Sequence, residues 1–251
     1  MRKQMISLLA GGPLEWVGRE IYYMSLDIIP DRFLSAKVIQ GRDYDRLTIR
    51  IAREVLAEGG NSIDVGANAG HILKALVSIS PSGSHWAFEP IPRFAVHLRK
   101  HFPMVTVRQL ALSDHAGMMD FRFLPRDPAY SSLLTRPEIE AGQEVKVLPT
   151  EVRELDDCVP DDTSIAFVKI DVEGAEAEVL RGATRLLERC KPVVVFECST
   201  TTLKDCVLIL EQTGLRVSLL ADYVVGVKRG MDELMMIAQE QDEFYYVASP
   251  Y

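Results

Sequence analysis

The stretch Asn61-Ser62-Ile63-Asp64-Val65-Gly66-Ala67-Asn68-Ala69-Gly70-His71 has the residue order of a buried strand that turns through glycines into a helix. Ile63 and Val65 are β-formers, and apolar residues continue at helical spacing after Gly70. A strand, a tight loop and a helix N-terminus in this order present free backbone N–H groups to a ligand. The stretch therefore predicts a nucleotide-type cofactor site around which an α/β sheet is built.

The glycine spacing indicates which cofactor the loop favours. It reads Gly-x-x-x-Gly, with Asp64 two residues before the first glycine, and lacks the Gly-x-Gly-x-x-Gly of a dinucleotide site. An acid at the strand end, together with backbone donors, suits a zwitterionic cofactor such as S-adenosylmethionine. NAD is disfavoured for the same reason, and a plain strand-to-helix turn is the simplest alternative.

Length and composition favour a single large α/β domain. The chain has 251 residues, of which 47% are apolar and 25% charged. Its net charge of −8 argues against nucleic acid as the main partner. Four cysteines without a Cys-x-x-Cys pair are expected to be reduced thiols packed as small buried residues. The apolar run 5–10 is too short for a signal peptide or a membrane span, so we expect a cytoplasmic protein.

Residues 1–43 are expected to form a helical extension outside the central sheet. Apolar residues recur at steps of three and four from 13 to 30, which indicates an amphipathic helix. Because this helix precedes the cofactor strand, it is expected to brace the domain, with a lid or a homodimer contact as alternatives. A second helix is predicted at 44–57, and residues 44–251 form the cofactor-binding domain.

An acid is placed at the end of the second predicted strand. The strand 84–88 runs into Glu89-Pro90, about one βα unit beyond Asp64. In nucleoside-binding α/β folds, a carboxylate at this position accepts hydrogen bonds from the ribose hydroxyls. The loop 111–114 is expected beside this strand end, where Leu112 flanks an adenine ring. An ordinary strand-end charge and a plain turn are the alternatives.

The other periodic segments complete an alternating α/β pattern. Extended segments at 118–124 and 144–148 flank a long loop, which we assign to substrate recognition or lid closure because long loops in compact domains tend to be functional. Helices are predicted at 93–101, 175–187, 203–212 and within 222–241, and strands at 105–110, 165–170, 192–196, 215–220 and 244–248.

The segment from Ile165 to Glu176 is the second informative stretch. Its apolar strand ends at Asp171, at the edge where open α/β sheets bind ligands. Asp171 and Glu173 lie at the N-terminus of the next helix, and capping alone is an alternative explanation for both. Lys169 lies inside the strand, and because an unpaired buried ammonium is costly it should have a partner or face a cleft.

Four segments in this order resemble the FkbM-type S-adenosylmethionine-dependent methyltransferases. They are Asp64–Gly70, Phe88–Pro90, Ala111–Asp114 and Lys169–Glu176, within a region of about 63–197. The resemblance implies a Rossmann-like class I methyltransferase fold: a seven-stranded, mostly parallel sheet with an antiparallel last strand and helices on both faces. It also implies O-methylation in sugar or natural-product pathways, with S-adenosylhomocysteine as the product.

The resemblance also implies roles for individual residues. Asp171 and Glu173 would face the transferred methyl group and the acceptor. The implied cofactor contacts are Asp64, Gly66, Asn68 and Gly70 for the methionine moiety, Glu89 with Pro90 for the ribose, Leu112 and Ser113 for the adenine, and Asp171 beside the methyl group.

Methyl transfer to a hydroxyl needs an aligned acceptor and a group that takes its proton. Asp171 or Glu173 is expected to act as the general base, or to act through a divalent ion. The carboxylates of Asp171, Glu173 and Glu197 suit Mg²⁺ but show no diagnostic ligand spacing, so no metal is predicted. The expected partner is a small-molecule acceptor. The competing hypotheses are a nicotinamide-dependent oxidoreductase and a non-catalytic cofactor-binding scaffold.

Overall fold

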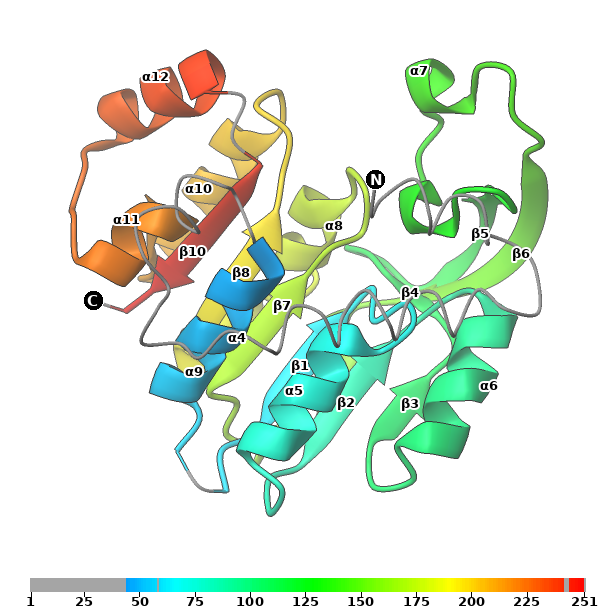
Figure 1. Cartoon of the computed structure of the whole chain (residues 1–251), viewed down its shortest axis with the longest axis horizontal. Helices are drawn as coiled ribbons and strands as arrows, with labels where there is room; N and C mark the ends of the chain where they lie inside the picture. Colours follow the sequence, from blue (N-terminus) through cyan, green and yellow to red (C-terminus); the bar gives the residue numbers. More distant parts are fainter. Residues whose placement is uncertain (1–43, 58, 242–243, 251) are drawn as a thin grey trace.

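The computed structural model describes residues 44–57, 59–241 and 244–250, which are built around one seven-stranded sheet (Figure 1). The strand order is β3-β2-β1-β7-β8-β10-β9, and β10 alone among these strands runs antiparallel to its neighbours. The predicted sheet, with its antiparallel last strand, is therefore confirmed. The strands are β1 Ser62–Val65, β2 His85–Phe88, β3 Thr106–Arg108, β7 Phe167–Ile170, β8 Val193–Glu197, β9 Arg216–Leu219 and β10 Tyr245–Ser249.

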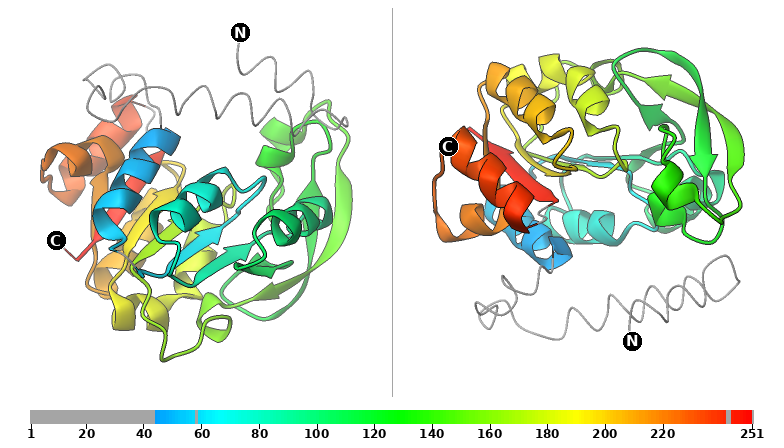
Figure 2. Two further views of the ribbon diagram at one scale, coloured as in Figure 1. Left: turned by 60° about the horizontal axis from the view of Figure 1, so that its bottom comes forward. Right: turned by 90° about the horizontal axis from the view of Figure 1, so that it is seen from above.

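Helices cover both faces of this sheet, as the view from above shows (Figure 2). One face packs against α4 Tyr44–Val55, α5 His71–Ile79, α6 Pro92–His101 and α11 Leu220–Val225. The other face packs against α8 Glu176–Arg181, α9 Thr184–Cys190, α10 Leu203–Gln212 and α12 Met231–Gln241.

Side-chain alternation along each strand produces the two cores. In β8, Val194 and Phe196 belong to the core under α8 and α10, whereas Val193 and Val195 belong to the core under α4 and α5. Both sets are buried because helices lie on both sides. This is why the central strands read as continuous apolar runs in the sequence.

A second, three-stranded sheet was not predicted. It has the order β4-β6-β5 and consists of β4 Ala111–Leu112, β5 Gly117–Phe123 and β6 Lys146–Arg153. The segment 111–114, predicted as a loop, thus begins as a strand that pairs parallel with β6. The reason is a non-local partner, since Ala111 pairs with Val152 far along the chain. The long loop between β5 and β6 contains two short helices, η2 Pro128–Tyr130 and α7 Pro137–Glu140.

Three further features differ from the expectations. The single helix predicted at 175–187 is divided into α8 and α9 at Gly182, where an added Cβ would lie 2.1 Å from the Ser113 carbonyl oxygen. The short helix expected within 222–241 is present as α12, and an additional helix that was not predicted, α11, follows directly after β9. Cys198 and Cys206 are buried free thiols as expected, but Cys158 and Cys190 are only partly buried.

The predicted N-terminal helix and the boundary of the 1–43 extension lie outside the described residues. Within the described part of the chain, no helix is both long enough and apolar enough to cross a membrane.

Candidate active site

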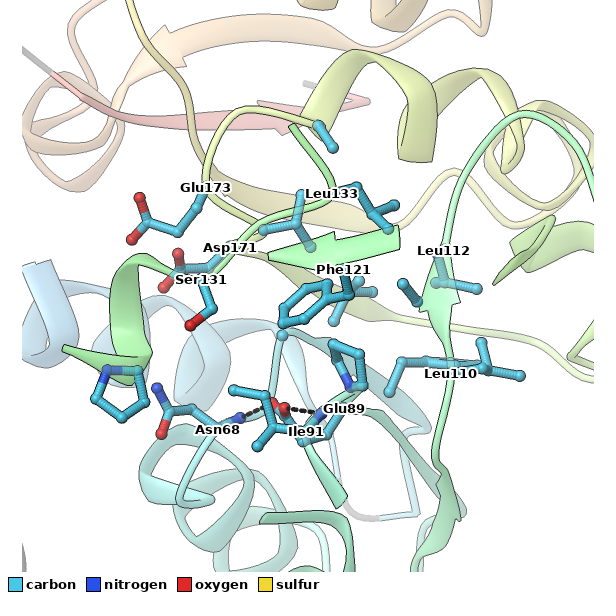
Figure 3. A pocket seen from close by; sticks show the side chains of 18 of the residues that line it. Asn68, Glu89, Ile91, Leu110, Leu112, Phe121, Ser131, Leu133, Asp171 and Glu173 are labelled. Carbon is cyan, nitrogen blue, oxygen red and sulfur yellow. Dashed lines mark hydrogen bonds between the residues drawn. The ribbon is translucent and has the colours of Figure 1, made fainter. Parts of the chain in front are cut away.

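A pocket with an empty volume of about 550 Å³ lies at the carboxyl ends of β1, β2 and β7 (Figure 3). Gly66, Glu89 and Asp171 each follow directly after one of these strands, and all three line the pocket. Parallel strands bring their carboxyl ends to one edge of the sheet, so residues far apart in the sequence meet there. The two informative stretches of the sequence therefore form one site.

Gly66 is required by the approach of two strand ends. Its φ is +75°, and an added Cβ would lie 1.8 Å from the carbonyl oxygen of Asp171. The sequence predicted close approach to a ligand; the structure shows close approach to the neighbouring strand end, on the wall of the pocket. The glycine thereby sets the distance between the β1 loop and Asp171.

Gly70 serves helix packing and does not line the pocket. It precedes α5 in a left-handed conformation, and an added Cβ would lie 2.6 Å from a methyl carbon of Leu98 and 2.8 Å from the Phe102 ring. The structure therefore accounts for a glycine here by the close approach of α6 and the residue that follows it, and the expected ligand contact at Gly70 stays a prediction. His71, the next residue, has its pKa lowered to about 4, chiefly through burial and also through Lys74 and Lys169.

Asp64 is the buried partner of a lysine, and its contact with the methionine moiety stays a prediction. The Asp64 side chain is 1% exposed, does not line the pocket, and has its Oδ1 3.9 Å from Lys169 Nζ. The same ammonium donates to Asp171 Oδ2 at 3.0 Å. Lys169 therefore has the partners that its position demanded, and it joins the ends of β1 and β7.

These charges change each other's proton affinity. Burial raises the pKa of Asp64 to about 6, and Lys169 opposes the rise. Burial also opposes the charge on Lys169, but the carboxylates of Asp171 and Asp64 outweigh it and hold the Lys169 pKa above its usual value. The ammonium is thus charged, and it stabilises both carboxylates.

Glu89 is fixed at the base of the pocket by two backbone donors. Its Oε1 accepts the N–H of Ile91 at 2.8 Å, and its Oε2 accepts the N–H of Asn68 at 2.7 Å (Figure 3). Burial raises its pKa to about 7, and both hydrogen bonds lower it. Glu89 and Pro90 line the pocket together, as the sequence predicted for a strand-end acid.

The second sheet and the long loop supply an apolar wall that sequence reasoning only partly located. Leu112 lines the pocket, whereas Ser113 does not: it is buried, and its N–H donates to the Arg153 carbonyl. Leu110 and Phe121 also belong to the wall. The sequence signals for the loop's part were its length and its many hydrogen-bonding side chains, which led to its assignment to substrate recognition or lid closure.

Glu173 lies at the acidic end of the pocket and is held by the long loop. Its φ is +60°, which is uncommon for a residue with a side chain. Ser132 Oγ donates to the Glu173 carbonyl at 2.9 Å, and Arg136 Nη1 lies 2.5 Å from Glu173 Oε2. Burial raises the pKa of Glu173 to about 7; Asp171 adds to the rise and Arg136 opposes it.

Glu176, the first residue of α8, makes a contact that the sequence reading missed. Glu176 Oε1 accepts the N–H of Gly174 at 2.9 Å, and no side chain caps the helix at Ala175. Capping therefore does not account for Asp171 and Glu173. A Glu five residues after the strand-end acid Asp171 is the sequence signal that was available.

Three carboxylates converge beyond the pocket's acidic end. One oxygen each of Asp171, Glu173 and Glu197 lies within 4.8 Å of the others. Burial raises the pKa of Glu197 to about 9, and Asp171 and Glu173 add to the rise. Oxygen donors suit Mg²⁺, but Lys169 and Arg136 already place two cations against Asp171 and Glu173. The divalent ion therefore stays an alternative, as in the sequence reading.

The donor set fits S-adenosylmethionine. Leu110, Leu112 and Phe121 form an apolar wall suited to a flat base, and the buried acid Glu89 lies in the same pocket. Asn68 Oδ1 is buried and lacks a hydrogen-bond partner among the described residues, so a polar ligand group would satisfy it. Asp171 and Glu173 line the same pocket.

The class I methyltransferase fold has a sheet of order β3-β2-β1-β7-β8-β10-β9 with antiparallel β10, which is the order found here. The pocket at the ends of β1 and β2, with its acid, agrees with that fold. A family model described as the methyltransferase FkbM domain matches residues 64–220, more than half of the chain. The chain belongs to the FkbM methyltransferase family.

Two individual proteins illustrate the similarity. A curated relative, the 2-O-methyltransferase NoeI of Sinorhizobium fredii, is 27% identical over 144 residues, which cover 51% of this chain and 59% of that protein. The crystal structure of methyltransferase FkbM from Methylobacillus flagellatus KT superposes with a TM-score of 0.53 at 17% identity, covering 98% of this chain and 58% of that chain. The chain thus spans less than two thirds of each. The superposition supports the fold.

Proposed function

We propose that the protein is an S-adenosylmethionine-dependent methyltransferase that methylates a hydroxyl of a sugar or natural-product small molecule and releases S-adenosylhomocysteine. The observation that carries this proposal is a single pocket with an apolar wall and buried Glu89 at one end and the acids Asp171 and Glu173 at the other. The first end suits an adenosine group. The second suits a polar acceptor that must lose a proton.

Residues at the strand ends would hold the cofactor. Leu112 offers an apolar surface to the base, Glu89 accepts hydrogen bonds from hydroxyls, and Asn68 places a side-chain amide at the end of the β1 loop. When bound, S-adenosylmethionine supplies a methyl group on a positively charged sulfur, which makes the methyl carbon electrophilic. The negative charge of the nearby carboxylates favours this cation.

The chain's contribution to the reaction is alignment and proton removal. The long loop between β5 and β6 lines the pocket with Ser131 and Leu133, and we assign to it the exclusion of water from the reacting groups. Asp171 or Glu173 takes the proton of the acceptor hydroxyl. The printed name of the relative NoeI, a 2-O-methyltransferase, supports oxygen as the methylated atom.

Calorimetry tests the cofactor directly. We expect S-adenosylmethionine and S-adenosylhomocysteine to bind the purified protein, and NAD(H) not to bind measurably. Membership of the FkbM methyltransferase family supports this order of affinity. Tight binding of NAD(H) alone would contradict the proposal and favour the nicotinamide alternative.

An acceptor screen separates an enzyme from a cofactor-binding scaffold. We would incubate the protein with S-adenosylmethionine and a panel of methyl glycosides and polyketide alcohols, and measure S-adenosylhomocysteine together with the methylated product. Product that depends on both protein and acceptor is the expected result. S-adenosylhomocysteine released equally with and without every acceptor would favour the scaffold.

A further inference from the structure

The long loop between β5 and β6 reaches the acidic end of the pocket through one arginine. Arg136 Nη1 lies 2.5 Å from Glu173 Oε2 and 3.3 Å from the Glu173 carbonyl oxygen. Ser132 Oγ donates to the same carbonyl at 2.9 Å. The loop therefore fixes both the backbone and the carboxylate of Glu173, although it lies about 40 residues earlier in the chain.

Asp171 and Glu173 differ in what holds them. Asp171 is bound by the ammonium of Lys169, a side chain within β7 that is 7% exposed and also faces Asp64. Its cation is therefore part of the sheet. Glu173 depends on a cation supplied by the loop, and Arg136 is 25% exposed. Because the partner of Glu173 comes from the loop between β5 and β6, Glu173 is the acid whose charge can respond when an acceptor enters the pocket next to that loop.

We propose that Glu173 is the group that takes the proton from the acceptor hydroxyl and that Arg136 is the residue that positions it. This inference rests on the proposed function and deepens it, because it chooses between the two acids and adds a residue outside every segment of the family resemblance. Asp171 then remains a neighbouring carboxyl group held by Lys169.

The proposed step is balanced in atoms and charge. The O–H bond of the acceptor breaks, its proton passes to a Glu173 carboxylate oxygen, and the oxygen's electron pair forms the new bond to the methyl carbon. The bond from that carbon to sulfur breaks with its electrons left on sulfur. One cation and one carboxylate thus become a neutral thioether and a neutral carboxylic acid, beside a neutral ether.

Glu173 lies among several charged or titratable groups, and these set its proton affinity. Arg136 favours its ionised form, whereas burial and the nearby acids oppose it and hold its pKa at about 7. A base with such a pKa is suited to proton transfer near neutral pH. The groups that face it are Asp171 after β7, Glu176 on α8, Glu197 at the end of β8, Tyr130 on η2 and Arg136 itself.

Strand β5 provides a matched control for Arg136. Arg122, near the end of β5, pairs with Glu140 on α7, with Nη2 2.5 Å from Oε2, and this pair also fastens the long loop. Arg122 has no interaction with Glu173 among those resolved. The two arginines are about equally exposed, at 26% and 25%. Replacing either by methionine removes one partly buried cation that holds the loop, but only Arg136→Met removes it from the proposed proton acceptor.

The first test follows the Glu173 carboxyl by NMR in protein labelled with ¹³C at glutamate side-chain carboxyls, with Glu173→Gln assigning the signal. We expect Arg136→Met to raise the Glu173 titration midpoint by about one to three pH units, the usual effect of losing an adjacent opposite charge. Arg122→Met should leave the midpoint unchanged, and Arg136→Lys should restore most of it. A midpoint unmoved by Arg136→Met overturns the inference, and this test needs no acceptor.

The second test is kinetic and uses the best acceptor from the glycoside and alcohol panel. Glu173→Gln should lower kcat about 10²- to 10⁴-fold, the usual contribution of a general base. Arg136→Met should move the acidic limb of the kcat–pH profile to higher pH, with the rate recovering there; a merely structural defect lowers the rate at every pH. An acidic limb abolished by Asp171→Asn and retained in Glu173→Gln would overturn the inference.

S-adenosylhomocysteine calorimetry separates failure of this inference from failure of the proposed function. The wild type, Arg136→Met and Arg122→Met should bind it with similar affinity. Absence of binding by the wild type would refute the proposed function itself. Retained binding together with an unmoved Glu173 midpoint would refute only the role of Arg136.

Discussion

Replacing Lys169 by methionine tests the buried charges beneath the pocket. Lys169 is 7% exposed, and its ammonium lies 3.0 Å from Asp171 Oδ2 and 3.9 Å from Asp64 Oδ1. Methionine has a similar length and fills the volume. It leaves Asp64, which is 1% exposed, with no cation beside it. Breaking a buried ion pair in this way costs about 3 to 5 kcal/mol, because one charge remains buried without compensation.

The loss should depend on pH with a definite sign. The pKa of Asp64 is raised by burial from 3.8 to about 6, so the folded state binds a proton more readily than the unfolded state. Ionisation of Asp64 therefore lowers the free energy of unfolding as the pH rises from about 3.8 to about 6. Removing Lys169 raises the Asp64 pKa further, so this loss of stability continues to higher pH. We expect the deficit of Lys169→Met to be larger at about pH 8 than at about pH 5, where Asp64 becomes neutral.

Urea unfolding followed by circular dichroism measures both quantities. Lys146→Met is the matched control, since Lys146 pairs with Glu144 at 3.4 Å with both side chains more than half exposed, and it should change stability by less than about 1 kcal/mol. Adding Asp64→Asn to Lys169→Met should recover part of the loss. A Lys169→Met protein within about 1 kcal/mol of the wild type at both pH values would refute the reasoning.

Three shorter predictions follow from the site. Gly66→Ala should destabilise the protein by at least about 3 kcal/mol more than Gly142→Ala in thermal unfolding. The two glycines have nearly equal φ values, +75° and +73°, but of the two only Gly66 has an atom within 4 Å of the added Cβ. Equal losses of stability would contradict this steric explanation. Glu89→Gln should weaken S-adenosylhomocysteine binding because the glutamine side chain has only one oxygen acceptor, so the N–H of either Asn68 or Ile91 would face the amide NH2, which only donates. Asp171→Asn should chiefly lower kcat, and equal effects on affinity alone would argue against this division. Activity should survive exhaustive chelation, because Lys169 and Arg136 already neutralise the strand-end acids; a loss restored by Mg²⁺ would place an ion among the three carboxylates.

Local patterns in the sequence were sufficient for the central sheet. Strand runs such as that before Asp171 are apolar because helices cover both faces, and their ends are marked by Gly66, Glu89 and Asp171. The carboxyl ends of parallel strands share one edge. The acids Asp64, Glu89 and Asp171 were expected to meet there; Glu89 and Asp171 line one pocket, and Asp64 lies behind it beside Lys169. The partner requirement of Lys169 was likewise readable, since a buried ammonium needs a counter-charge.

Other features depended on contacts between distant segments. Asp64 was expected at the ligand, but the proximity of Lys169 across the β1–β7 pair makes it a buried counter-ion. Gly70 was expected to approach a ligand, and its neighbours are Leu98 and Phe102. Neither outcome follows from residue type alone, because a carboxylate or a glycine is compatible with both roles.

The sequence by itself determined the order of strands and helices and the acids at the strand ends, because periodicity and chain-local turns encode them. Tertiary structure alone decided which side chains meet across segments. It paired β4 with β6 to build the apolar wall, and it brought Arg136 to Glu173. The physical reason is that such pairings depend on register and packing between segments tens of residues apart, which no local pattern specifies.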